Sequence, residues 1–117
     1  MATRYDLGMD DGFYRGDDIP FTFTFTDEVP NPVDLTGKTV YFTIKLTPTT
    51  ADADADYRGE FTTGGADGIA TFTMTQAESA ALLPTIYEYD LQILDGGSLT
   101  THLYGKIKFI GGDLDNV

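Results

Sequence analysis

The feature that most constrains the fold is a strict alternation of apolar and polar residues between positions 18 and 26. One side of the alternation carries Ile19, Phe21, Phe23 and Phe25, and the other carries Asp18, Pro20, Thr22, Thr24 and Thr26. Side chains of a β-strand point alternately to the two faces of a sheet, so this segment predicts a strand with an aromatic ridge on one face. At helical spacing the same residues would scatter around the axis. We therefore expect the rest of the chain to supply strands that cover the ridge.

Five later segments also have strand character, namely residues 39–46, 57–62, 69–74, 86–94 and 99–110. In the first of them Val40, Phe42, Ile44 and Leu46 share one face, and in the last Leu99, Thr101, Leu103, Gly105, Ile107 and Phe109 do. The glycine-rich residues 64–68 predict a hairpin that joins 57–62 to 69–74. A second hairpin is expected at residues 95–98, where two glycines accept positive φ angles. Six or seven strands at regular spacing predict a β-sandwich.

One short helix is expected after residues 69–74. The sequence Thr75-Gln76-Ala77-Glu78 predicts a capping box, in which the side chains of Thr75 and Glu78 each accept a hydrogen bond from the backbone N–H of the other. Good helix formers follow, and Pro84 stops the helix after about two turns. A short helix before Tyr87 and Tyr89 is typical of the crossover in immunoglobulin-like domains, where a tyrosine hydroxyl ties the corner down. Either tyrosine fits that role, and the alternative is that both are ordinary core or sheet residues.

The length of 117 residues predicts one domain with a single core. We expect an immunoglobulin-like antiparallel β-sandwich of six to seven strands with one short helix, over residues 16–110. Residues 1–15 are expected to be an N-terminal arm or first strand, which docks on its own domain or on a neighbour, and residues 111–117 a C-terminal tail. Apolar residues near the two ends are interface candidates: Tyr5, Leu7, Phe13, Tyr14, Ile110, Leu114 and Val117.

The chain is strongly acidic, with 19 Asp and Glu residues against 7 Lys and Arg residues and a net charge of −12. Because such a charge repels phosphate backbones and anionic lipid, we expect no nucleic-acid and no membrane partner. The first residues lack the apolar region of a signal peptide, and no apolar run reaches membrane-spanning length. The absence of cysteine excludes disulfides and thiolate metal sites, and it fits folding in a cytosol.

No catalytic constellation is visible in the sequence, so we expect neither enzyme activity nor a cofactor. His102 is the only histidine, and we expect it on the polar, exposed side of its strand, without partners for a triad or a metal site. Asp52, Asp54 and Asp56 alternate like the start of a calcium loop and are weak candidate metal ligands. The sixth and twelfth positions of such a loop need Gly and Glu, which this chain lacks there. A solvated loop without metal is the favoured interpretation.

Two stretches together resemble bacteriophage tail proteins. The first is Gly16-Asp17-Asp18-Ile19-Pro20-Phe21-Thr22-Phe23-Thr24-Phe25, and the second is Pro32-Val33-Asp34-Leu35-Thr36-Gly37-Lys38-Thr39-Val40-Tyr41-Phe42-Thr43-Ile44-Lys45. This pattern is similar to the N-terminal domain of the phage baseplate upper protein family and its short stand-alone relatives. In that group a Gly-Asp opens an alternating strand, an Asp-Leu-Thr-Gly turn follows, and the next strand ends near a lysine. The strand at residues 68–72, the short helix and the segment 87–91 follow in the same order, so the resemblance covers most of residues 16–109.

The resemblance implies an immunoglobulin-like assembly module of a virion, without an active site. We expect a bacteriophage structural protein made in the host cytoplasm, acting as a tail or baseplate adaptor or joining module. Its partners would be other virion proteins (tail, baseplate or capsid components), and it would form a symmetric homo-oligomer in the particle. One alternative is a capsid decoration or head fibre protein. An alternative of another class is a carbohydrate- or calcium-binding sandwich, supported by the aspartate loop and by Tyr41, Tyr57 and Tyr104.

Overall fold

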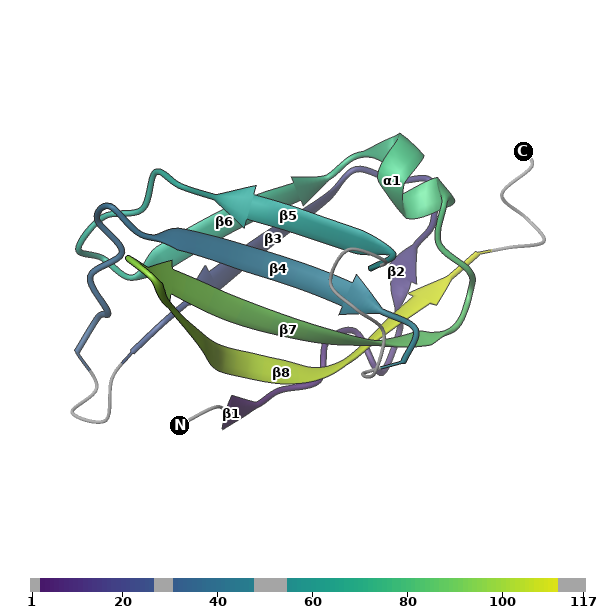
Figure 1. Cartoon of the computed structure of the whole chain (residues 1–117). Coiled ribbons are helices and arrows are strands. Elements are labelled where there is room, and N and C mark those ends of the chain that lie inside the picture. Colours follow the sequence, from purple (N-terminus) through teal and green to yellow (C-terminus); the bar gives the residue numbers. More distant parts are fainter. Residues whose placement is uncertain (1–2, 27–30, 48–54, 112–117) are drawn as a thin grey trace.

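The computed structural model describes residues 3–26, 31–47 and 55–111 as two packed layers of strands with one helix (Figure 1). The elements are β1 (Thr3–Arg4), β2 (Phe13–Tyr14), β3 (Ile19–Thr24), β4 (Thr39–Lys45), β5 (Tyr57–Phe61), β6 (Ile69–Met74), α1 (Gln76–Ala80), β7 (Ile86–Asp95) and β8 (Ser98–Ile110). The larger sheet has the order β1–β8–β7–β4–β5, and β2 also pairs with β8. The smaller sheet contains β3 and β6. No helix in these ranges is long and apolar enough to cross a membrane.

The aromatic ridge of β3 forms the centre of the core, as predicted. All four apolar side chains, Ile19, Phe21, Phe23 and Phe25, are buried, whereas the alternating residues of β3 are exposed. Phe42 of β4 meets the ridge edge-on from the opposite sheet, with its ring centroid 5.0 Å from that of Phe21 and 5.1 Å from that of Phe23. Such pairs contribute about 0.5–1.5 kcal/mol beyond the burial of their area, so these rings help to hold the two sheets together.

The strand pairing is that of an immunoglobulin-like sandwich. β8, β7, β4 and β5 occupy the places of the G, F, C and C′ strands, and β3 and β6 those of the B and E strands. All pairs among these six strands are antiparallel, as predicted. The N-terminal segment departs from that pattern, because β1 and β2 run parallel to β8. This pairing shows that the arm docks on its own domain.

The predicted hairpin of residues 57–62 and 69–74 is wrong. β5 pairs with β4 while β6 pairs with β3, so these consecutive strands lie in opposite sheets. Their connection is tied to both layers: the N–H of Phe25 donates to the carbonyl of Gly68 at 2.8 Å, and the N–H of Leu35 to that of Gly65 at 2.9 Å. Gly68 has a φ of +72°, and a Cβ there would lie 2.6 Å from the carbonyl oxygen of Phe25. The glycines therefore allow a crossing between sheets rather than a tight reversal.

A bulge in β8 changes the predicted face of that strand. The register between β7 and β8 shifts after Leu91, so Gln92 faces Thr101 and His102 becomes the extra residue. The residues of β8 between the bulge and the hairpin turn therefore point to the opposite faces from those predicted. Leu99, which was expected to share a face with Ile107 and Phe109, is 46% exposed. Leu46 was also expected beside Val40, Phe42 and Ile44, but it is 47% exposed because β4 ends at Lys45.

The capping box of α1 is confirmed. The backbone N–H of Glu78 donates to Thr75 Oγ1 at 3.2 Å, and that of Thr75 donates to Glu78 Oε1 at 2.9 Å. The helix ends at Ala80, well before Pro84, and is shorter than the two turns expected. The guanidinium of Arg15 donates at 2.9 Å to Ala80 O, the last carbonyl of the helix, and also to Leu82 O just beyond it. The chain leading into β3 is thereby fastened to the crossover.

The corner after α1 is closed by Tyr87, one of the two tyrosines proposed for this role. Tyr87 is buried near the start of β7, and its hydroxyl accepts a hydrogen bond of 2.7 Å from the backbone N–H of Leu83. This is the tyrosine corner of immunoglobulin-like domains. Tyr89, two residues later, is buried as well but donates instead to the backbone carbonyl of Tyr5, in the N-terminal arm.

Candidate protein-binding face

The larger sheet has one side on the core and the other side free of protein cover in the described part of the chain. We call this second side the outer face. Its members follow from the pairing register and from the buried positions that alternate with them: Arg4, Asp6, Thr39, Tyr41, Thr43, Lys45, Arg58, Glu60, Ile86, Glu88, Asp90, Gln92, Leu94, Leu99, Thr101, Tyr104, Lys106 and Lys108. Figure 1 shows this sheet as a twisted surface from β5 across β4 and β7 to β8.

Positive charge is concentrated on the outer face. Five of the seven Lys and Arg residues of the chain belong to it: Arg4, Lys45, Arg58, Lys106 and Lys108. Its carboxylates are Asp6, which pairs with Arg4 at 3.4 Å, and Glu60, Glu88 and Asp90, whereas the whole chain has 19 acidic residues. The outer face is thus net positive on a protein with a net charge of −12. Charge of this kind guides partner choice and association rate more than it raises affinity.

Several contacts fix the side chains of this face. Lys106 Nζ donates to Glu88 Oε2 at 2.7 Å, across the pairing of β7 with β8. The guanidinium carbon of Arg58 lies 4.3 Å from the ring centroid of Tyr41, and Arg58 Nη1 donates to Thr43 Oγ1 at 3.3 Å. Arg58 therefore covers Thr43, which is buried although it points away from the core. This cation–π contact keeps the guanidinium of Arg58 over the ring of Tyr41.

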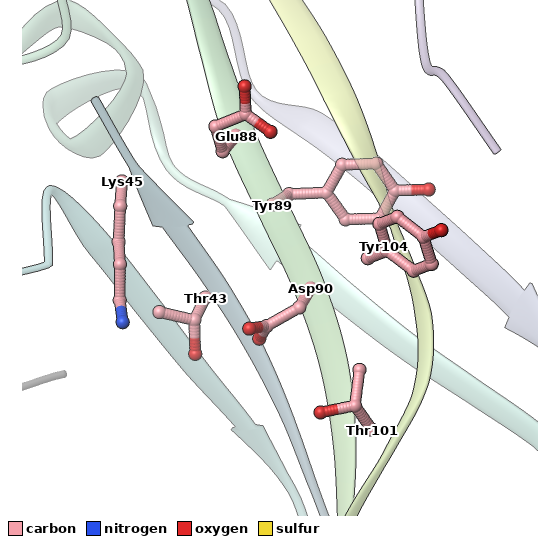
Figure 2. Close-up of a pocket in the computed structure, with 7 residues that line it drawn as sticks. All are labelled: Thr43, Lys45, Glu88, Tyr89, Asp90, Thr101 and Tyr104. Carbon is pink, nitrogen blue, oxygen red and sulfur yellow. The ribbon is translucent and has the colours of Figure 1, made fainter. Parts of the chain in front are cut away.

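The middle of the outer face is hollowed. The hollow has a volume of about 140 Å³ and is lined by Thr43, Lys45, Glu88, Tyr89, Asp90, Thr101 and Tyr104 (Figure 2). Figure 2 shows Thr43 and Asp90 side by side on the neighbouring strands β4 and β7, with Lys45 further along β4. Glu88 and Asp90 lie on the central strand β7, with Lys45 on β4 to one side and Lys106 on β8 to the other. A shallow hollow with aromatic, cationic and polar walls suits side chains of another protein.

The five predicted interface residues that lie in the described part of the chain do not gather into one surface. Leu7 and Phe13 pack against the core, and the Phe13 ring lies edge-on 5.1 Å from Phe21. Tyr5 and Tyr14 are 61% and 55% exposed, and Ile110 is half-buried beside Tyr14 at the end of β8. Leu114 and Val117 lie outside the described residues. Whether these residues contact a partner stays a prediction.

The metal candidates are divided by the limits of the described chain. Asp52 and Asp54 lie outside it. Asp56 is exposed, and its Oδ2 accepts a hydrogen bond of 3.0 Å from the N–H of Leu46. Within the described ranges no three His, Asp or Glu side chains gather as a metal-binding group. The expected exposure of His102 is wrong: it is half-buried with its ring 5.8 Å from that of Phe25, and burial lowers the pKa of its imidazole.

Sequence reasoning missed the outer face as a site. The signal was present, because Lys45, Arg58, Lys106 and Lys108 occupy polar positions of alternating segments. Their convergence depends on the order β5–β4–β7–β8, which places segments far apart in the sequence side by side. Without that order the cations appear scattered along the chain.

Comparison with solved structures finds remote likenesses in fold. The N-terminal domain of phage TP901-1 ORF48 aligns with a TM-score of 0.47 and 10% sequence identity, over 94% of this chain and 83% of that one. No protein-family model matches the chain, and no curated protein matches it.

Proposed function

We propose that this chain is a structural protein of a bacteriophage virion, a tail or baseplate adaptor or joining module that acts through protein–protein contacts. The observation that carries the contact role is the outer face, where five cations and two tyrosines lie on a strongly acidic protein. Tyr and Arg are enriched in the centres of protein interfaces. The resemblance of residues 16–45 to phage tail proteins supports the place of that contact in a virion.

The test is to mix the purified chain with each virion protein encoded beside it and to measure the mass of the products by light scattering. We expect a complex of defined mass with a tail or baseplate component, and the chain itself among the proteins of purified particles. Binding to intact capsid shells instead would favour the head decoration alternative over the adaptor. Absence of the chain from purified particles, together with no binding to any of these proteins, would overturn the proposal.

A further inference from the structure

The net positive outer face of one molecule is complementary to the acidic remainder of another. We propose that the outer face binds an acidic surface of a second copy of this chain, in a head-to-tail contact. This inference rests on the proposed function and deepens it by naming the partner of the face.

The charge distribution argues for an acidic occupant. Lys45 and Arg58 flank the central strand β7 on one side, and Lys106, Lys108 and Arg4 flank it on the other. Within the face, Glu88 pairs with Lys106 and Asp6 with Arg4. Two outer faces in direct contact would bring ten cations against eight carboxylates, so a positive excess would stay uncompensated, whereas the acidic remainder of a second copy compensates it. A symmetric face-to-face dimer is therefore disfavoured.

The same chain offers complementary carboxylates. Asp17, Asp18 and Glu78 are exposed near α1 and the start of β3, and Asp34 and Asp67 are exposed near the other end of β3. Because the outer face is net positive, the net negative charge of the chain comes from the residues outside it. Any second copy of the chain therefore supplies acidic groups. The overall charge of −12 opposes association at long range, but at physiological ionic strength charges separated by more than about 8 Å are largely screened. Local complementarity then decides whether two copies bind.

A head-to-tail contact joins different surfaces of the two copies, so a bound pair still has one free outer face and one free acidic surface. Contacts of this kind repeat until they close into a ring or extend as a stack. The outer face of one terminal copy and the acidic surface of the other stay available in an open assembly. A head-to-tail contact can therefore be tested with a variant whose outer face is damaged, because its acidic surface still binds to the outer face of an intact copy.

The first experiment measures self-association of the full chain by sedimentation velocity and light scattering over a range of concentrations. We expect the intact chain to assemble, and Lys45→Glu and Lys108→Glu, on opposite flanks of the face, each to raise the dissociation constant at least about tenfold. Lys38→Glu is the matched control, since it makes the same change in net charge but lies off the face, beside Asp95. Circular dichroism and thermal unfolding confirm that each variant is folded.

The second experiment adds an excess of the double variant K45E/K108E to the intact chain. We expect the variant to be monomeric alone and to cut the assemblies down to one-to-one complexes, because it keeps its acidic surface. Three results would overturn the inference: an intact chain that stays monomeric at every attainable concentration, equal losses in Lys38→Glu, or a double variant that fails to join the intact chain. A monomeric chain that still binds a virion component would contradict this inference alone and leave the proposed function standing.

Discussion

The hydroxyl of Tyr89, in the middle of the sandwich, donates a hydrogen bond to the backbone carbonyl of Tyr5 in the N-terminal arm. Tyr89 is paired with Gly105 of β8, the strand that lies between it and the arm. A glycine at this position leaves the path open, since a Cβ at Gly105 would lie 2.4 Å from the oxygen of Tyr5. The arm is further held by the N–H of Tyr5, which donates to Tyr104 O at 2.8 Å, and by the N–H of Lys106, which donates to Asp6 Oδ1 at 2.9 Å.

Tyr89→Phe should loosen the arm without altering the core, because only the hydroxyl is lost. We expect the free energy of unfolding to fall by about 1 kcal/mol, the usual net contribution of one hydrogen bond. Amide hydrogen exchange should become faster at Tyr5 and Leu7, while the amides of β4 stay protected. Tyr41→Phe on the outer face is the control and should leave exchange in the arm unchanged. Equal exchange at Tyr5 in the two variants would show that the hydroxyl does not hold the arm.

Gly105→Ala should displace the arm by a steric route. Its Cβ would be 2.4 Å from the backbone oxygen of Tyr5 and 2.8 Å from Asp6 Oδ1, so the arm must move. We expect a loss of about 1–3 kcal/mol in the free energy of unfolding, as for other overpacked sites. Gly97→Ala is the matched control, because nothing lies within 4 Å of its Cβ. Denaturant unfolding of both variants checks the prediction, which would be wrong if the two lost equal stability.

Local patterns explain why much of the fold could be predicted from the sequence. The alternation in β3, the capping box at Thr75 and the spacing of Tyr87 each depend on a few neighbouring residues, and each was confirmed. The failures involve choices that local patterns do not encode. The glycines at residues 64–68 fit a hairpin as well as a crossing, and the bulge at His102 depends on the fit of β8 against β7. The outer face depends on the strand order. The sequence shows its cations, but it does not show that they lie on one face of the folded protein.

The capping box predicts a measurable contribution from Thr75. Replacing Thr75 with Ala removes the acceptor for the N–H of Glu78, and N-cap losses of this kind cost about 1 kcal/mol of unfolding free energy. The helix has five residues and lies between β6 and the tyrosine corner, so the loss should appear as a lower midpoint of thermal unfolding. Thr75→Ser keeps the hydroxyl and should recover most of the loss. If Ser and Ala variants unfold at the same temperature, the cap does not stabilise the fold.

Stability should fall at alkaline pH because of Tyr57. Burial, and to a smaller extent the charge of Glu78, raises the pKa of its phenol to about 12, whereas a tyrosine in an unfolded chain has a pKa of about 10. Between these values the unfolded chain has lost the proton that the folded chain keeps, so ionisation favours unfolding. The contribution of Tyr57 to stability is complete below about pH 10 and is lost as the pH rises toward 12.

We expect the midpoint of thermal unfolding to drop between pH 10 and pH 12, and to drop less in the variant Tyr57→Phe. Tyr89 contributes in the same sense, because burial raises its pKa too, so the decline should be reduced in Tyr57→Phe rather than abolished. A variant that declines as steeply as the intact chain would exclude Tyr57 as a source of the alkaline loss.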